Sequence, residues 1–187
     1  MTRIVAGTLG GRRIAAPPGG GTRPTSDRVR EALFSAVQAE VDLVGARFAD
    51  LFAGSGAVGL EALSRGAEHV LLVESDPRAA RVVRENIATL RAAPAARLVT
   101  GRVATVLAAG PDGGPYDVVF ADPPYAVSEE EVTAMLAALV EGDWLTADAL
   151  VVVERSSRSA PFTWVEGVTC TRSRRYGETT LWYGRRS

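Results

Sequence analysis

The sequence has very little of what disulfides, metal sites and nucleophilic triads require. Among its 187 residues there is one cysteine, Cys170, and one histidine, His69. One cysteine cannot form an internal disulfide, and these two residues cannot supply the ligands of a zinc site. We therefore expect no metal, and Ser-His-Asp or Cys-His chemistry is poorly supported. We interpret Cys170 as a small apolar residue of the core.

Long apolar runs are also missing. No stretch approaches the roughly 18 residues that span a bilayer, and the start MTRIVAGTLGGRR lacks the apolar region of a signal peptide. These absences favour a cytoplasmic protein with no membrane partner. The composition of 47% hydrophobic and 23% charged residues nevertheless permits a sizeable core, and the length suits one domain with small appendages.

Lysine is absent, and all 21 basic residues are arginines. They are concentrated at the two ends: residues 1–30 hold six arginines and one acid, and residues 155–187 hold seven arginines and two acids. Because guanidinium groups pair with phosphates in a bidentate way, basic ends around an acidic centre favour contact with a polyanion. Ordinary solvated arginines explain the charge pattern equally well.

The beginning of the chain predicts a hairpin followed by a helix. Residues 3–16 form short apolar runs around Gly10 and Gly11, which is typical of a hairpin with a glycine turn. After a Gly/Pro linker, Ser26 or Asp27 can cap a helix. The apolar positions that share one face of this helix are Val29, Leu33, Phe34 and Val37.

From Arg47 onward, strand and helix patterns alternate. The predicted strands are residues 47–52, 69–74, 96–100, 116–121 and 149–154. Such βαβ units build a parallel sheet. Apolar runs at residues 162–168 and 179–183 have no helix between them and predict an antiparallel hairpin at the sheet edge. The expected fold class is α/β, with a mainly parallel seven-stranded sheet, an antiparallel C-terminal hairpin and an N-terminal β-hairpin extension; we divide it into an extension of residues 1–24 and a main domain of residues 25–187.

A glycine-rich loop follows the first strand of this series. In DLFAGSGAVG, Gly54, Gly56 and Gly59 satisfy GxGxxG, and Glu74 ends the next strand, 20 positions after Gly54. A carboxylate there can accept both hydroxyls of an adenosine ribose, which fits NAD as well as other adenosine ligands. Asp50, just before the loop, would repel a pyrophosphate but suits an ammonium group. This favours S-adenosylmethionine, whose tail is zwitterionic.

A second motif, DPPY, follows the fourth predicted strand. Two prolines fix the backbone, so the Asp122 carboxylate and the Pro123 carbonyl form a rigid pair of acceptors. The exocyclic amine of a nucleobase offers two N–H donors to such a pair, and Tyr125 offers a ring on which the base can stack. The motif therefore predicts a clamp for an exocyclic amine.

These segments resemble known enzymes. DLFAGSGAVGLEALSRGA, VESD and VFADPPY resemble the class I S-adenosylmethionine-dependent methyltransferases that act on exocyclic amines. RIVAGTLGGRRI and TRPTSDRVREALF are similar to the RsmD family, bacterial 16S ribosomal RNA guanine-N2 methyltransferases specific for guanine 966, and the resemblance covers nearly the full chain. It implies a Rossmann-like fold, S-adenosylmethionine with S-adenosylhomocysteine as product, and 16S rRNA, within an assembling 30S subunit, as partner. We expect a monomer.

The resemblance leaves alternatives. DPPY also occurs in DNA adenine and cytosine methyltransferases and, as NPPY, in protein glutamine methyltransferases. An NAD-dependent oxidoreductase fits the glycine loop but leaves DPPY and Asp50 unexplained, and a non-catalytic RNA-binding module has no need of that loop. Related enzymes often place an acidic or amide side chain near the adenine amine, whereas here Arg102 precedes Val103, so we expect backbone contacts to adenine.

The predicted site residues fall into three groups. The catalytic group is Asp122, Pro123 and Tyr125; the cofactor group is Asp50, Phe52, Ala53, Gly54, Ser55, Gly56, Glu74, Ser75 and Val103; and the group for the RNA substrate is Arg3, Arg12, Arg13, Arg23, Pro124 and Tyr125.

Overall fold

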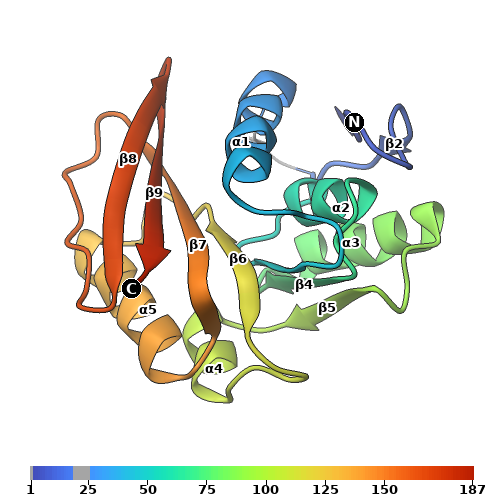
Figure 1. Cartoon of the computed structure of the whole chain (residues 1–187). Helices are drawn as coiled ribbons and strands as arrows, with labels where there is room; N and C mark the ends of the chain where they lie inside the picture. The colour runs from blue at the N-terminus through green and yellow to red at the C-terminus, as the bar shows by residue number, and fades with distance from the viewer. Residues whose placement is uncertain (1, 19–25) are drawn as a thin grey trace.

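The computed structural model describes residues 2–18 and 26–187 and contains the predicted seven-stranded sheet (Figure 1). Its strands are β3 (Arg47–Asp50), β4 (His69–Glu74), β5 (Ala96–Thr100), β6 (Tyr116–Ala121), β7 (Leu145–Ser156), β8 (Val168–Tyr176) and β9 (Thr179–Arg186). They lie in the order β5-β4-β3-β6-β7-β9-β8. The first five are parallel, and β9 runs antiparallel to both β7 and β8. The expected α/β, Rossmann-like fold is confirmed.

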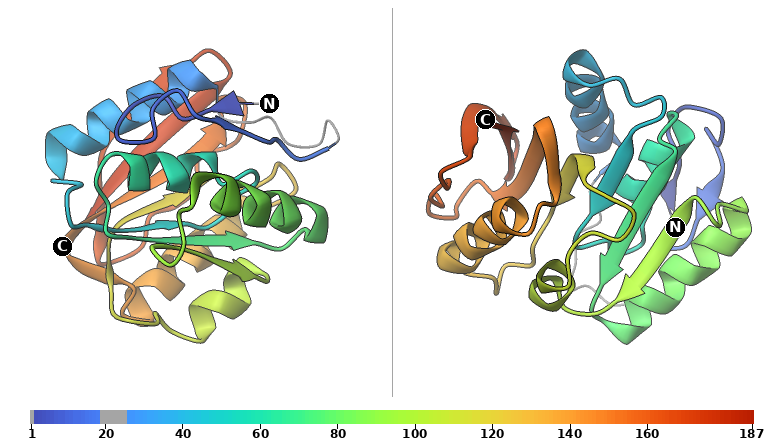
Figure 2. Two further views of the ribbon diagram at one scale, coloured as in Figure 1. Left: turned by 90° about the vertical axis from the view of Figure 1, so that its right-hand side faces the viewer. Right: turned by 60° about the horizontal axis from the view of Figure 1, so that its bottom comes forward.

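Helices cover both faces of this sheet (Figure 2). They are α1 (Asp27–Glu40), α2 (Ala57–Ser64), α3 (Pro77–Leu90), α4 (Val103–Ala108) and α5 (Glu129–Glu141). Leu33 of α1 and Val83 of α3 share a core with Phe120, while Leu107 of α4 and Leu136 of α5 lie in a second core on the opposite face. Burial on both faces explains why the central strands are continuous apolar runs. None of the helices in the described ranges has the length and apolarity that crossing a membrane requires.

The C-terminal hairpin is present, but its first strand was predicted in the wrong place. Residues 162–168 lead up to the strand, and the ring of Phe162 packs 5.1 Å from that of Trp164 and 5.9 Å from that of Trp182. The strand β8 begins at Val168 and carries the polar sequence VTCTRSRRY. Because β8 is an edge strand that is held by backbone pairing with β9, it needs no apolar alternation. Cys170 is exposed on this edge, so its interpretation as a core residue was also wrong.

The predicted N-terminal hairpin is confirmed, although its strands are short. Strand β1 (Thr2–Arg3) pairs antiparallel with β2 (Arg13–Ile14), and Gly11 in the turn has φ +84°. Ile4, directly after β1, is fully buried, and Ile14 of β2 is 2% exposed; both lie in the same core as α1, α2 and α3. The hairpin is therefore packed onto the helices that cover one face of the sheet.

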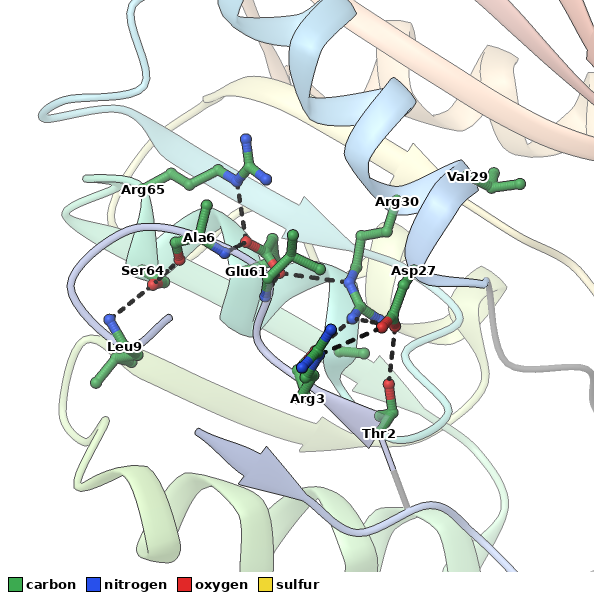
Figure 3. A network of polar contacts seen from close by, with 12 residues as sticks. Thr2, Arg3, Ala6, Leu9, Asp27, Val29, Arg30, Glu61, Ser64 and Arg65 are labelled. Carbon is green, nitrogen blue, oxygen red and sulfur yellow. Dashed lines mark hydrogen bonds and ion pairs between the residues drawn. The ribbon is translucent and has the colours of Figure 1, made fainter. Parts of the chain in front are cut away.

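A buried network of charges attaches the hairpin to α2 (Figure 3). The Glu61 carboxylate accepts the backbone N–H groups of Val5 at 2.8 Å and Ala6 at 3.0 Å. It also pairs with Arg65 Nε at 2.9 Å and with Arg30 Nε at 3.4 Å. Arg30 and Glu61 are both fully buried. Since the buried acid is matched by two guanidinium groups, the hairpin is held by paired charge as well as by apolar packing.

Candidate active site

A cavity of about 970 Å³ opens at the carboxyl ends of the parallel strands. Strands β3 and β6 are neighbours there, and the chain leaves β3 towards β4 but enters β6 from the far edge of the sheet. Open α/β sheets bind ligands at this kind of switch point. The predicted site residues that line the cavity are Asp50, Phe52, Ala53, Gly54, Ser55, Glu74, Ser75, Val103, Asp122, Pro123, Pro124 and Tyr125.

The three glycines of the loop have different structural roles. Gly54 has φ +59°, and a Cβ on it would meet no atom within 4 Å, so the cavity is open at this point. Gly56, with φ +85°, is the N-cap of α2 and is not among the lining residues. A Cβ on Gly59 would lie 2.3 Å from Leu72 Cδ2 and 2.9 Å from Val70 Cγ1. Gly59 therefore permits close packing of α2 on β4.

Glu74, at the end of β4, is fixed by two backbone hydrogen bonds. Its Oε1 accepts Gly54 N–H at 2.8 Å and its Oε2 accepts Asp76 N–H at 2.8 Å. A carboxylate has about four acceptor positions, so the two oxygens retain room for further donors from the cavity. This geometry fits the ribose contact that the sequence predicts, which stays a prediction.

Asp50 is a buried acid with one unpaired oxygen. Its Oδ2 accepts Gly59 N–H at 3.1 Å, and its Oδ1 has no hydrogen-bond partner in the described part of the chain. Burial raises the pKa of Asp50 to about 7, and the charges of Glu74 and Glu154 also raise it, against the hydrogen bond from Gly59. A cation in the cavity would pair with Oδ1 and remove this cost of burial. Asp50 thus fits the ammonium group of S-adenosylmethionine.

The DPPY segment follows β6 directly and places two kinds of group in the cavity. Burial holds the pKa of Asp122 well above its ordinary value, the charge and hydrogen bond of Glu154 and the charge of Asp50 raise it further, and Arg155 lowers it. Tyr125, in contrast, is 72% exposed. A half-buried acceptor and an exposed ring in one cavity suit an amine that enters on a flat base. No three His, Cys, Asp or Glu side chains in the described ranges form a metal-binding group.

Two polar residues in or next to this site were missed by the sequence analysis. Glu154 of β7 lines the cavity and is 9% exposed. Asn86 of α3 is 1% exposed; its Nδ2 donates to Ser55 O at 2.8 Å and to Ala15 O at 2.9 Å, and its Oδ1 accepts Ala15 N–H at 2.8 Å. Asn86 therefore ties the segment after the hairpin to the glycine loop. For both residues, the sequence signal that could have identified them is a polar side chain on an otherwise apolar face of its strand or helix.

Three of the arginines predicted for the substrate do not line the cavity. Arg3, Arg12 and Arg13 are exposed on the hairpin. Arg3 Nε lies 3.6 Å from Asp27 Oδ2, and Arg12 Nη2 donates to Thr89 O at 3.0 Å. Arg23 lies outside the described residues. Any role of these side chains in RNA binding would be outside the cavity and stays a prediction.

Comparisons with known proteins agree with this geometry. The family model described as "Conserved hypothetical protein 95" matches residues 2–185. Ribosomal RNA small subunit methyltransferase D of Escherichia coli strain K12 is 42% identical over 152 residues, which are 81% of this chain and 73% of that protein. The solved structure of a hypothetical protein from Thermus thermophilus matches with a TM-score of 0.80 at 33% identity and covers 98% of each chain.

A more distant structure supports the fold alone. An RNA methyltransferase from Salinibacter ruber, solved with S-adenosyl-L-homocysteine, is 18% identical, with a TM-score of 0.66 over 87% of this chain and 93% of that chain. The 42% identical relative, which is named as a methyltransferase, supports S-adenosylmethionine over NAD, the choice that the glycine loop left open. The chain belongs to the RsmD family of S-adenosylmethionine-dependent methyltransferases.

Proposed function

We propose that this chain transfers a methyl group from S-adenosylmethionine to the exocyclic N2 amine of a guanine in 16S rRNA, at a site of the guanine 966 type. The observation that carries the proposal is the shared cavity, in which Asp122 and Pro123 stand beside the glycine loop and Glu74. The cavity can hold a methyl donor while a base enters at the exposed ring of Tyr125. A volume of about 970 Å³ has room for both.

The chain's own residues would activate the amine. A guanine N2 is a poor nucleophile because its lone pair is delocalised into the ring. When Asp122 and the Pro123 carbonyl accept its two hydrogens, the nitrogen can become pyramidal and direct its lone pair at the methyl group. Acceptors that are already in place also stabilise the positive charge that develops on nitrogen.

Other residues would bind the cofactor, which when bound supplies an electrophilic methyl group on a sulfonium. Asp50 Oδ1 would pair with its ammonium, and Glu74 would accept its ribose hydroxyls. The open space at Gly54 would let the ligand approach the backbone. Val103, behind Arg102 at the start of α4, would contact the adenine through its backbone.

Several features favour RNA over DNA or protein as the substrate. The E. coli and Haemophilus influenzae relatives are named as small subunit ribosomal RNA methyltransferases. The exposed hairpin carries Arg12 and Arg13, which suit phosphates. We propose that residues 1–24 serve as an RNA-docking extension of the catalytic domain of residues 25–187. The enzyme would act as a monomer on an assembling 30S subunit in the cytoplasm.

The proposal is tested by methyl transfer to two substrates. Naked 16S rRNA and 30S subunits, both from a strain that lacks the enzyme, are incubated with labelled S-adenosylmethionine, and the modified nucleoside is identified by mass spectrometry. We expect N2-methylguanosine. A methylated adenosine or cytidine as the product would refute the choice of guanine, and comparison of the two substrates shows which of them is recognised.

The unpaired oxygen of Asp50 predicts a pH-dependent affinity for the cofactor. Asp50 must be ionised to pair with an ammonium, and its pKa in the free protein is about 7. The affinity for S-adenosylhomocysteine should therefore be constant from this pKa up to the pKa of the ligand's own ammonium, and should fall about tenfold for each pH unit below the pKa of Asp50. Isothermal titration calorimetry at a series of pH values measures this change, and a flat profile would contradict it.

Asp50→Asn should separate cofactor binding from stability. Asparagine can still accept Gly59 N–H but cannot attract the ammonium, so the affinity should be low and independent of pH. The folded state holds the Asp50 proton more tightly than the unfolded state, so stability is lost as the pH rises from about 4 to 7. Neutral asparagine should recover up to about 4 kcal/mol at alkaline pH, which thermal melting of the free protein measures.

Replacing Arg12 and Arg13 with alanine tests the docking role of the hairpin. RNA affinity should fall, and the log-log salt dependence should flatten by up to about 0.7 for each phosphate that the protein no longer neutralises. Cofactor affinity should not change. If the hairpin has only a packing role, the melting temperature will fall while the salt slope stays the same. Arg12 bonds to Thr89, so Arg13→Ala alone is the control that leaves that hydrogen bond intact.

A further inference from the structure

Glu154 is a buried acid in the cavity wall that the proposed reaction does not yet use. It stands towards the carboxyl end of β7, whose parallel neighbour is β6. In this pair Phe120 lies opposite Val152. Asp122 lies two residues after Phe120, and Glu154 lies two residues after Val152. Because side chains alternate between the faces of a sheet, the side chains of Asp122 and Glu154 lie on the same face. The sheet therefore places the two carboxyl groups side by side.

Glu154 raises the pKa of Asp122 through its charge and through a side-chain hydrogen bond. Two ionised carboxylates have no proton to donate, so this bond requires a proton on one of the two groups. Burial favours the same state, because it penalises two negative charges in one small volume. The neighbouring positions of the two acids on the sheet and the raised pKa of Asp122 together favour one proton shared between them.

The charged groups around this pair lie on two strands, β3 and β7. Asp50 at the end of β3 adds negative charge, and Arg155 of β7 opposes it. The Arg155 side chain is engaged elsewhere: Nη2 donates to Val127 O at 3.1 Å and lies 3.8 Å from Glu129 Oε1. No surrounding charge in the described part of the chain therefore replaces the shared proton.

We propose that Glu154 is a positioning residue for methyl transfer, which holds the proton shared with Asp122 and turns the free oxygen of Asp122 towards the substrate amine. This inference rests on the proposed function. Before reaction the two acids together carry one negative charge. A Glu154 that donates to one oxygen of Asp122 leaves the other oxygen as the acceptor for the amine.

The same arrangement gives the released proton a destination. As the new N–C bond forms, the S–C bond breaks and its electron pair stays on sulfur, which loses its positive charge. The nitrogen then carries one proton too many and gives it to the free oxygen of Asp122. The two acids become neutral, and one proton passes to water when the product leaves.

The first test is the pH dependence of the rate with saturating cofactor and RNA. In the native enzyme the rate should fall as the pH rises through the raised pKa of the pair. Once the shared proton is lost, Glu154 can no longer donate to Asp122 and no longer orients it towards the amine. Glu154→Gln should lose this alkaline decline, since its amide donates at every pH, and should keep the plateau rate. Glu154→Ala has no donor and should lose about tenfold or more, as expected for one hydrogen bond to a charged group.

The second test detects the proton in the free protein without any substrate. Infrared titration in an Asp50→Asn background follows the carboxylic acid band of the pair, because that background lacks the signal of Asp50. We expect Glu154→Gln to move the midpoint of the remaining band to lower pH by about one unit or more, since Asp122 then lacks a charged neighbour. Asp122→Asn should shift the Glu154 band in the same direction and serves as the second variant.

The outcomes are distinct. An unmoved infrared midpoint, an alkaline decline retained in Glu154→Gln, or equal plateau losses in the glutamine and alanine variants would each overturn the role of Glu154. If ribosomal RNA is not methylated at all, the proposed function fails, whereas the infrared titration still decides whether the proton is shared.

Discussion

Replacing Asp122 with alanine is expected to lower the rate of methyl transfer about 10³-fold, the typical effect of losing a positioned group that stabilises the transition state. The variant removes the acceptor that both orients the amine and takes up its proton. Affinity for S-adenosylhomocysteine should stay close to the native value, because Asp50, Glu74 and the glycine loop are untouched. Single-turnover methylation and calorimetry measure the two effects separately.

Asp122→Asn separates the two roles of this residue. Asparagine keeps a carbonyl oxygen that accepts one N–H of the amine, but it cannot take up the proton. Its rate should therefore lie between those of the native enzyme and the alanine variant. Full activity in Asp122→Ala would refute the clamp, and a loss of cofactor affinity equal to the loss of rate would show that Asp122 acts mainly in binding.

The central strands could be predicted because they are buried on both faces. Residues 70–73 form an uninterrupted apolar run, and the strand predicted over 69–74 matches β4 to the residue. The helix α5 begins at Glu129, directly after its N-cap Ser128, and ends at Glu141. In such segments the local sequence and tertiary burial favour the same structure, so the pattern of apolar residues is sufficient to predict the element.

The edge of the sheet could not be predicted in this way. The exposed side chains of β8 carry no apolar alternation, and the strand exists because its backbone pairs with β9. The aromatic residues just before it, Phe162 and Trp164, pack against the second core from a loop. Their hydrophobicity indicated burial correctly but was misinterpreted as a strand.

The candidate site shows the same division. Most residues of the glycine loop and DPPY could be predicted because each motif is contiguous in sequence. The partner of Asp122 could not, since Glu154 reaches it only through the pairing of β6 with β7. The sequence also indicates that Arg30 and Glu61 are buried charges. Arg30 falls on the face of α1 that buries Leu33, and Glu61 lies in the otherwise apolar segment AVGLEALS of α2. A lone charge in an apolar stripe requires a buried partner of opposite sign.

The pairing of these two charges predicts a large loss of stability in Glu61→Gln. The groups around the carboxylate are all donors: the N–H groups of Val5 and Ala6 and the guanidinium groups of Arg30 and Arg65. A glutamine would turn its NH₂ towards donors and leave the fully buried Arg30 with only Asp27, whose Oδ1 lies 3.0 Å from Arg30 Nη2, as an acidic partner among the described residues.

The expected destabilisation is about 3 to 5 kcal/mol, as for other buried ion pairs that lose one partner. For a chain of this length it corresponds to a melting temperature lower by about 10 °C. Glu31→Gln, an exposed change one residue after Arg30 on α1, is the matched control and should have little effect. Hydrogen exchange gives a local measure, because the N–H groups of Val5 and Ala6 should exchange faster in Glu61→Gln before the central strands do. An unchanged melting temperature with these two amides still protected would mean that apolar packing of Ile4 and Ile14 alone holds the hairpin.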